Sequence, residues 1–339
     1  MTDRVLDISR EPARLSIRNS LLVVETGGVE RAAIPCEELA AVVIGHRQVS
    51  LTQAVLSELA KAGALLVTCD EKFHPAAMVL PLDAHHAQAE RFRAQATMDA
   101  PRKKRLWQDV VRAKIRAQAN LLRAVTGSDE GLGALVSRVR SGDPDNVEAR
   151  AARRYWSRLF EEDGFRRRDE EDVRNHLLNY GYAVLRALTA RSICGAGLHP
   201  SFSLHHTNAA NPFGLADDLM EPFRPLVDEM VRAEEVPELS PEMKHTLVGG
   251  LLRRYEAEGE VRTLPDILTR VAQSLAAIVM GAREKLWLPE LRPATEDETG
   301  GPNSCRSASA ARRDHDTTAD GSDSAVDAER QDPASPHGD

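Results

Sequence analysis

The stretch GLHPSFSLHHTNAANPFGLADDLMEPFRPLVD, residues 197–228, places two adjacent histidines just before a dense acidic cluster. Asn211 and Pro212 favour the start of a helix, because asparagine caps helices and proline loses no hydrogen bond in the first turn. On a helical period, the acidic side chains fall within an arc of about 100° and the apolar ones lie on the other side. Pro222 predicts a bend at the end of this helix. The acidic residues are Asp217, Asp218 and Glu221, and the apolar ones are Leu215, Leu219 and Phe223.

This acidic face has two interpretations. Three carboxylates on one face repel one another, which raises a pKa or attracts a cation, and His205 or His206 adds a neutral nitrogen ligand nearby. Oxygen and imidazole ligands together suit Mg²⁺ or Mn²⁺. The alternative is a solvated acidic helix beside two surface histidines, since charged helix faces are common. These residues alone leave both interpretations open.

Glu148 is a second carboxylate in an unusual position. Residues 147–160 predict a helix that Asp145 or Asn146 can cap, and Glu148 falls in the middle of its apolar stripe. A carboxylate on the apolar side is costly unless it is paired or binds a metal. The alternative is that Glu148 complements the helix dipole or pairs with an arginine. The stripe consists of Ala152, Tyr155 and Leu159.

Three segments, in this order, resemble the signatures of the CRISPR-associated integrase family, the spacer-acquisition proteins of prokaryotic adaptive immunity. They are NVEARAARRYW (residues 146–156), RNHLLNYGYAVL (174–185), and LHHTN (204–208) followed by LADDLMEPFRPLVD (215–228). The resemblance covers roughly residues 1–291. Its wording is most similar to members from systems that use a single large RNA-guided effector nuclease (type II).

The resemblance implies a metal-dependent DNA endonuclease and integrase. It assigns Glu148, His206 and Glu221 as the catalytic ligands of one divalent cation, Mg²⁺ or Mn²⁺. His206 is preferred to His205 because the family's spacing of fifteen residues between histidine and acid runs from His206 to Glu221. His205 and Asp218 then become supporting or auxiliary groups.

By the same resemblance, the 3′-hydroxyl of a captured foreign DNA fragment attacks a phosphodiester at the edge of a CRISPR repeat. This transesterification inserts the fragment as a new spacer. The implied partners are DNA, a second copy of the chain in a homodimer, and a small ferredoxin-like CRISPR-associated subunit that completes a heterohexamer. A contact with the large effector nuclease remains open. Two other functions also remain open: a stand-alone structure-specific metal-dependent DNA nuclease, and a non-catalytic DNA-binding scaffold.

Charge is unevenly distributed along the chain, whose net charge is −8. Residues 295–339 carry 11 acidic and 4 basic residues, whereas residues 91–123 carry 10 basic and 2 acidic ones. Basic stripes attract DNA more than the total charge repels it, although a solvated helix face is the alternative. The candidates for contacts with the DNA backbone are Arg102, Lys103, Lys104, Arg105, Arg150, Arg153, Arg154 and Arg166.

The patterning predicts an α+β protein. Residues 1–80 are expected to form a small β-sandwich around one helix at 51–62, and the resemblance implies that this domain mediates dimerisation. Residues 81–86 are a predicted linker. Residues 87–294 predict a larger all-α catalytic domain, which helices at 237–256 and 264–286 close, and Gly181 permits a close helix crossing. Residues 295–339 predict a disordered acidic tail.

Four cysteines lie far apart and form no CxxC motif, which predicts reduced thiols, a cytoplasmic protein and no zinc site. The chain shows no signal peptide and no apolar run of membrane length, so we expect no membrane partner. The cysteines are Cys36, Cys69, Cys194 and Cys305.

Overall fold

The computed structural model describes residues 4–70, 75–81, 85–160, 165–167, 169, 171–206, 208–234 and 240–294. The predicted tail at 295–339, with Cys305, and residues 82–84 of the predicted linker lie outside this part of the chain. Cys36, Cys69 and Cys194 are free thiols, as predicted. The described residues group into one compact unit by their contacts, so a division into domains at 81–86 stays a prediction.

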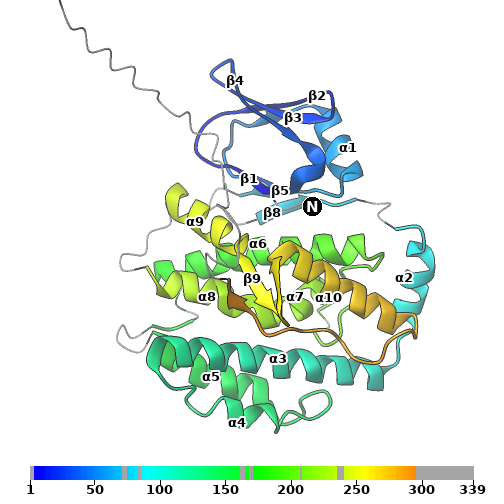
Figure 1. The fold of residues 1–339 in the computed structure, drawn as a ribbon, viewed down its shortest axis with the longest axis vertical. Coiled ribbons are helices and arrows are strands. Elements are labelled where there is room, and N and C mark those ends of the chain that lie inside the picture. Colours follow the sequence, from blue (N-terminus) through cyan, green and yellow to red (C-terminus); the bar gives the residue numbers. More distant parts are fainter. Residues whose placement is uncertain are drawn as a thin grey trace, which may run out of the picture. The chain divides into compact units, whose positions relative to one another are not determined.

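The first part of the chain forms two four-stranded sheets, which confirms the predicted N-terminal strands (Figure 1). One sheet has the order β1-β5-β7-β8 and the other has the order β4-β3-β2-β6. The strands are β1 (Arg4–Ile8), β2 (Arg14–Arg18), β3 (Leu21–Thr26), β4 (Val29–Pro35), β5 (Leu39–Ile44), β6 (Ser50–Leu51), β7 (Leu65–Cys69) and β8 (Pro75–Val79), with the 3₁₀ turn η1 (Cys36–Glu38) and helix α1 (Gln53–Lys61) between them.

Local sequence explains this pairing. Strand β5 is buried along its whole length and pairs in parallel with both β1 and β7, as expected of a continuously apolar strand. Gly27 and Gly28 both have positive φ angles and form the two-residue turn between the antiparallel strands β3 and β4. The two sheets and α1 enclose one apolar core, which includes Leu15, Leu22 and Leu59.

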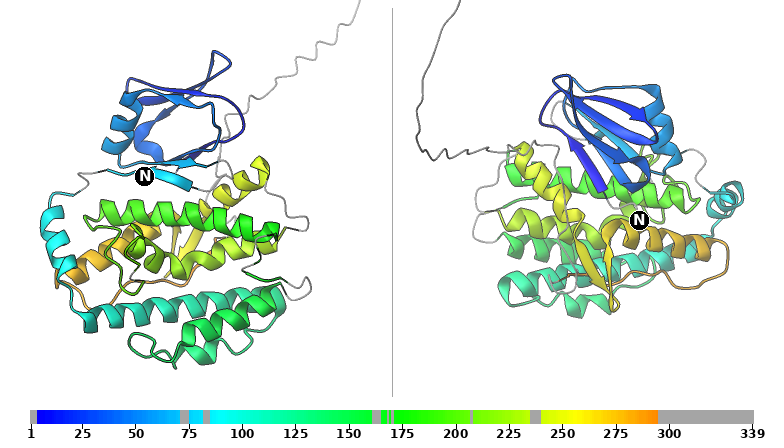
Figure 2. Two further views of the ribbon diagram at one scale, coloured as in Figure 1. Left: turned by 180° about the vertical axis from the view of Figure 1, so that it is seen from behind. Right: turned by 45° about the horizontal axis from the view of Figure 1, so that its top comes forward.

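The remaining part of the chain is mainly helical. In Figures 1 and 2, helices α7, α8 and α10 lie between α6 and α3, and α5 packs on the outer side of α3. The helices are α2 (Gln88–Ala96), α3 (Ala100–Thr126), α4 (Gly133–Val136), α5 (Val147–Leu159), α6 (Val173–Gly195), α7 (Gly214–Met220), η3 (Glu221–Phe223, a 3₁₀ turn), α8 (Arg224–Arg232), α9 (Pro241–Leu251) and α10 (Leu264–Val279).

The all-α expectation for this part is wrong in one place, where a three-stranded antiparallel sheet forms. Its strands are β10 (Glu260–Thr263), β9 (Arg254–Ala257) and β11 (Arg292–Pro293), in that order. The predicted helix at 237–256 gives way to β9 because Glu258 and Gly259 adopt positive φ angles and turn the chain back. The predicted helix at 264–286 ends early, since Gly281 also has a positive φ angle just after α10.

The central helix α6 brings the site together, because it packs against α7, α8, α9 and α10. Gly181 on α6 faces Val227 on α8, and a Cβ atom at Gly181 would lie 2.4 Å from Val227 Cγ1. The predicted close crossing is therefore confirmed. Arg191, also on α6, donates a hydrogen bond of 2.6 Å to the carbonyl of Gly63, which ties α6 to the N-terminal strands.

Candidate active site

Glu148 lies in the first turn of α5, and the preceding loop fixes the direction of that turn. The carboxylate of Asp143 accepts hydrogen bonds from the backbone N–H groups of Val147 (3.0 Å) and Glu148 (2.9 Å). Neither predicted cap fills this role, because Asp145 pairs with Arg140 instead and Asn146, at φ 52°, makes no side-chain cap. The Asp143 carboxylate satisfies two of the free N–H groups at the helix start.

Lys114 lies between two carboxylates that come from distant parts of the chain. Its ammonium nitrogen is 2.5 Å from Glu148 Oε1 and 2.6 Å from Glu221 Oε2. The three side chains are largely buried, at 11%, 22% and 5% exposure for Lys114, Glu148 and Glu221. Glu148 is therefore paired, as one alternative required, but its partner is a lysine on α3 rather than an arginine.

Glu221 is held in its charged form. Burial alone would raise its pKa, but the Lys114 ammonium and the Arg224 guanidinium outweigh this and lower the pKa below the usual value. Arg224 Nη2 lies 3.1 Å from Glu221 Oε1. The opposite oxygen, Oε2, is buried and faces Lys114 without the alignment of a hydrogen bond. Taken as whole residues, Glu221 and Asp218 are only 4% and 0% exposed, so the interpretation as a solvated acidic helix is excluded.

Asp218 fixes the conformation of the loop that carries His205 and His206. Its Oδ2 accepts hydrogen bonds from the backbone N–H groups of Leu204 (2.6 Å) and His205 (2.9 Å), and its Oδ1 lies 2.5 Å from Nδ1 of His206. This hydrogen bond raises the pKa of His206 above the ordinary value. The contact to Nδ1 leaves Nε2 of His206 as the nitrogen available to a ligand.

His205 has a different environment from its neighbour. Its ring stacks on the indole of Trp107, with centroids 4.5 Å apart and planes 1° from parallel. His206 meets the same indole edge-on at 5.1 Å. Trp107 lies two helical turns before Lys114 on α3, so one helix supports both the histidine loop and the cation between the carboxylates.

The three acidic residues of the opening stretch each have a different set of partners. Asp217 accepts hydrogen bonds from Arg186 Nε (2.6 Å) and Asn211 Nδ2 (2.7 Å), and so ties α7 to α6. Helix α7 starts at Gly214, later than Asn211 and Pro212 predict, because the Asn211 side chain accepts the N–H of Phe213 in a turn. The bend predicted at Pro222 is confirmed by η3.

Glu148, Glu221 and His206 are close enough that both carboxylates raise the pKa of the histidine, after its contact with Asp218. Within the described ranges, no three His, Cys, Asp or Glu side chains are already arranged around a common point as metal ligands. A single cationic nitrogen nevertheless fits between Glu148 and Glu221, and Glu221 Oε2 is a buried oxygen without a hydrogen bond. Two carboxylates and an imidazole of this kind could hold one divalent cation.

A buried carboxylate behind the site connects three helices. Asp228 on α8 accepts the hydroxyl of Tyr155 on α5 at 2.7 Å, and also that of Tyr182 on α6. Burial raises the pKa of Asp228 to about 6, although both hydroxyls lower it. The guanidinium of Arg224 lies over the Tyr182 ring, 4.7 Å from its centroid. These contacts fix α5, which carries Glu148, relative to α8, which follows Glu221.

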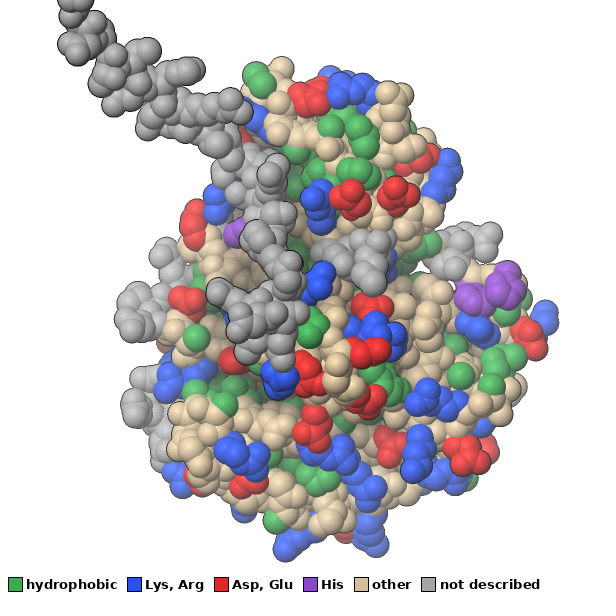
Figure 3. Space-filling view, in the orientation of Figure 1, with side chains coloured by type: hydrophobic (Ala, Val, Ile, Leu, Met, Phe, Trp, Pro, Cys, Tyr) green, Lys and Arg blue, Asp and Glu red, His purple; other side chains and the backbone are tan. Residues whose placement is uncertain are grey.

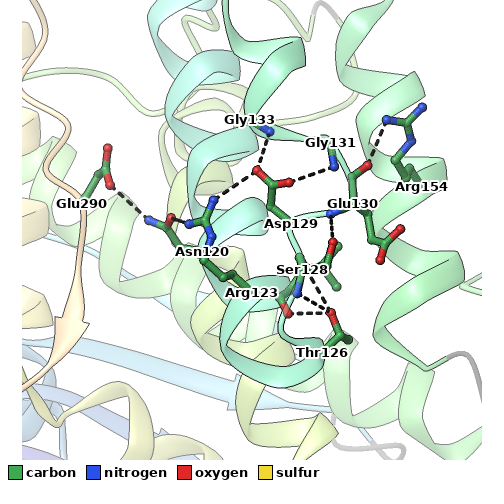
Figure 4. Close-up of polar contacts among 11 residues, drawn as sticks. Asn120, Arg123, Thr126, Ser128, Asp129, Glu130, Gly131, Gly133, Arg154 and Glu290 are labelled. Carbon is green, nitrogen blue, oxygen red and sulfur yellow. Dashed lines mark hydrogen bonds and ion pairs between the residues drawn. The ribbon is translucent and has the colours of Figure 1, made fainter.

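The predicted DNA-contacting residues lie mainly on outer faces. Lys104, Arg105, Arg150, Arg153, Arg154 and Arg166 are exposed, and Arg102 and Lys103 are half-buried. Figure 3 shows Lys and Arg side chains mixed with acidic ones at the bottom of the view, where Figure 1 shows α3, α4 and α5. Arg154 donates a hydrogen bond of 3.0 Å to the carbonyl of Glu130, within the corner that Asp129 organises (Figure 4). The arginines of α5 line a surface pocket with Glu130 and without Glu148: Arg150, Arg153, Arg154 and Arg158.

A basic cleft that the sequence prediction missed is linked to Glu221 through Arg224, which lines the cleft and pairs with Glu221. It has a volume of about 320 Å³ and lies between α6 and α8. Three arginines line it, Arg167, Arg186 and Arg224. Lys114 was also missed, although its position offered a signal: it falls on the apolar face of α3 with Trp107 and Val111. A cation on an apolar face requires a buried anion, just as the carboxylate of Glu148 on the apolar face of α5 requires a cation.

Comparison with known proteins identifies the family. The model of the family described as CRISPR associated protein Cas1 matches residues 6–234. This chain belongs to the Cas1 family. It is 39% identical over 292 residues to the CRISPR-associated endonuclease Cas1 of Neisseria meningitidis serogroup C (strain 8013), covering 84% of this chain and 95% of that protein. A Cas1 endonuclease of Pyrobaculum aerophilum is 30% identical over 283 residues, with 78% and 95% covered. The predicted resemblance is confirmed.

Solved structures share the Cas1 fold. A casposase bound to an integration product superposes with a TM-score of 0.70 at 19% identity, covering 84% of this chain and 92% of that one. A Cas1 protein from Thermotoga maritima gives 0.64 at 18% identity, covering 82% and 97%. No helix in the described part of this Cas1 chain is long and apolar enough to cross a membrane.

Proposed function

We propose that this Cas1 protein is a cytoplasmic, metal-dependent DNA integrase and endonuclease that inserts foreign DNA fragments into a CRISPR array. The observation that carries the proposal is the pair of carboxylates of Glu148 and Glu221, which flank the Lys114 ammonium. His206 and the basic cleft are nearby. Membership in a family of CRISPR-associated endonucleases supports nuclease chemistry. The likeness to a casposase bound to an integration product is a further argument for DNA joining.

Glu148, Glu221 and His206 would hold one Mg²⁺ or Mn²⁺, with His206 using Nε2. When bound, such a cation supplies Lewis acidity toward a DNA phosphate. Asp218 would keep the His206 ring in a fixed orientation through Nδ1, as carboxylates commonly do for metal-binding histidines. His205 would act through packing, because its ring is stacked on Trp107.

The chain's own residues bind and orient the DNA for transesterification. Arg167, Arg186 and Arg224 are placed to hold phosphates next to Glu221, and the exposed basic residues of α3 and α5 to hold the more distant backbone. The 3′-hydroxyl of the fragment forms a new bond to phosphorus while the bond to the 3′-oxygen of the repeat strand breaks. The proton of the attacking hydroxyl leaves to solvent, the released 3′-oxygen takes up a proton to become a hydroxyl, and one phosphodiester replaces another.

The proposed assembly contains a homodimer of this chain and a small ferredoxin-like subunit in a heterohexamer, with the large effector nuclease as a possible further partner. Fold relatives described as a Cas6-RT-Cas1–Cas2 complex, with a TM-score of 0.67, and as a Cas1–DNA complex, with 0.50, support a protein partner and DNA.

A strand-transfer assay tests this function. The purified protein and its small partner are mixed with a fragment bearing free 3′-hydroxyls and a plasmid carrying the repeat, with Mn²⁺ or with EDTA. We expect joining only with the metal, its loss in Glu148→Ala and in His206→Ala, and its retention in His205→Ala.

Other outcomes of this assay identify the rival functions. Cleavage of branched DNA, with no joining to any repeat sequence, would indicate a stand-alone nuclease. Joining by the full complex that survives Glu148→Ala would show that this chain is a non-catalytic scaffold.

A further inference from the structure

Lys114 occupies the position between Glu148 and Glu221 that a bridging cation would need. Its ammonium nitrogen lies 2.5 Å and 2.6 Å from the two carboxylates. Divalent cations bind carboxylate oxygens at roughly 2.0–2.6 Å. A cation that contacts these same two oxygens, Glu148 Oε1 and Glu221 Oε2, must therefore lie where the ammonium now lies, and the two cannot be present together.

Charge leads to the same conclusion. Glu148, Glu221, Lys114 and Arg224 form a buried group with two negative and two positive charges. A divalent cation added to this group would leave two uncompensated positive charges, and burial makes such an excess unfavourable. Removal of the Lys114 ammonium from the group lowers the excess to one.

We infer that Lys114 is an internal counter-ion that holds Glu148 and Glu221 together in the metal-free protein and that a divalent cation must displace. This inference rests on the proposed function, because it takes the same carboxylates as metal ligands. It adds a role for a residue on α3: Lys114 preserves the geometry of the site without metal and lowers its affinity for metal.

The side chain of Lys114 has the means to move. Lysine is an ammonium on a flexible four-carbon stem, in contrast to the planar guanidinium of arginine. Of the two carboxylates, Glu148 is the more exposed, at 22% against 5% for Glu221, so the open side of the group lies toward α5. Displacement toward that side brings the ammonium into contact with solvent.

Mn²⁺ binding to the full-length protein tests the inference without an activity assay. Lys114→Met keeps the length of the side chain and removes its charge. We expect it to bind Mn²⁺ at least tenfold more tightly by calorimetry, whereas Lys114→Arg, which keeps the charge, binds no more tightly than the native protein. Lys61→Met is the matched control, because it removes the same charge from an exposed ion pair with Glu58.

Thermal unfolding gives a second measurement on the same variants. Without metal, Lys114→Met leaves one buried negative charge uncompensated, because Arg224 still pairs with Glu221, and the variant should unfold at a lower temperature than the native protein. Saturating Mn²⁺ should remove this difference, because the cation replaces the missing charge. A deficit in Lys114→Met that Mn²⁺ leaves unchanged would contradict the inference.

Chemical labelling tests the native chain, independently of how well the variants fold. An amine-reactive ester should modify Lys114 slowly in EDTA and faster with Mn²⁺, while the labelling of Lys61 stays constant. If Mn²⁺ binds but neither the affinity of Lys114→Met nor the labelling of Lys114 rises, the displacement of Lys114 is refuted and the metal site stands. If neither the native protein nor Lys114→Met binds Mn²⁺, the metal site of the proposed function fails as well.

Discussion

Trp107 and His205 lie ring over ring, with centroids 4.5 Å apart and planes 1° from parallel. Trp107 belongs to α3 and is buried, whereas His205 belongs to the loop before α7. The stack places one histidine of the pair against the protein and turns the next, His206, toward Glu148 and Glu221. The two neighbouring histidines therefore have different environments, and we expect them to have different tasks.

Substitution of the two histidines should separate these tasks. His205→Ala removes the stack on Trp107 and should lower the free energy of unfolding by about 1 kcal/mol, since aromatic pairs contribute about 0.5–1.5 kcal/mol. Its DNA joining should persist. His206→Ala should lose joining in the same assay. Denaturant unfolding and strand transfer, measured side by side, check both statements. Loss of joining in His205→Ala alone would exchange the two assignments.

The crossing of α6 and α8 should be sensitive to a single methyl group. Gly181→Ala would place a Cβ atom 2.4 Å from Val227 Cγ1, and overpacking of this kind costs about 1–3 kcal/mol. Gly195→Ala, in the same helix, is the matched control, because nothing lies within 4 Å of the added atom. Denaturant unfolding should show a loss of stability for Gly181→Ala only, and Val227→Ala should partly restore it. Equal effects at both glycines would contradict the close packing.

Asp228 should make stability depend on pH in a defined window. Burial raises its pKa from 3.8 to about 6, so between these values the folded chain holds a proton that the unfolded chain releases. The unfolding free energy contributed by this group therefore falls as the pH rises from about 4 to 6. At about 1.4 kcal/mol per pKa unit, the fall is roughly 3 kcal/mol.

Asp228→Asn removes the titrating group, so its unfolding free energy, subtracted from the native value at each pH, isolates the effect. Tyr155→Phe deletes one hydroxyl that lowers the pKa of Asp228. It should extend the upper end of the window to higher pH, because only the pKa of the folded state changes. A difference between native protein and Asp228→Asn that stays constant from pH 4 to 7 would disprove the raised pKa.

The cap of α5 provides a test of local structure. Asp143→Ala removes the acceptor of two backbone N–H groups and should destabilise the protein by about 1–2 kcal/mol. Asp145→Ala, two residues away, removes only an exposed pair with Arg140 and should leave the stability close to that of the native protein. Thermal unfolding of the two variants decides between Asp143 and the predicted cap at Asp145.

Sequence patterns predicted what depends on local chemistry. The N-terminal strands, the bend at Pro222 and the close approach at Gly181 follow from residues whose preferences are strong and local. Glu148 could be predicted as a site residue because its position on the apolar face of the helix is incompatible with an unpaired charge. Strands β9 and β10 were missed because a two-residue turn at Glu258 and Gly259 overrides a helical pattern.

The partners of the site residues were harder to predict. Asp143 caps α5 from outside the usual position. Lys114 contacts Glu148, 34 residues later in the sequence, and Glu221, which follows much further along the chain. No spacing rule joins residues that tertiary packing alone brings together. The cleft of Arg167, Arg186 and Arg224 was missed for the same reason, since its members come from a loop and two helices.

The charged group of Lys114, Glu148 and Glu221 draws one residue from each of α3, α5 and η3. The contact of α3 with α5 closes a short stretch of chain, whereas η3 joins only after α6 and α7 have been made. Contacts between residues that are distant in sequence are slow to form, because closing a long loop costs entropy before the contact repays it. During synthesis, a chain that has not yet reached Glu221 carries a carboxylate and a lysine but no complete site. On the proposed assignment of these residues, the potential to cut DNA arises only with the assembled fold, and a partly folded chain lacks it.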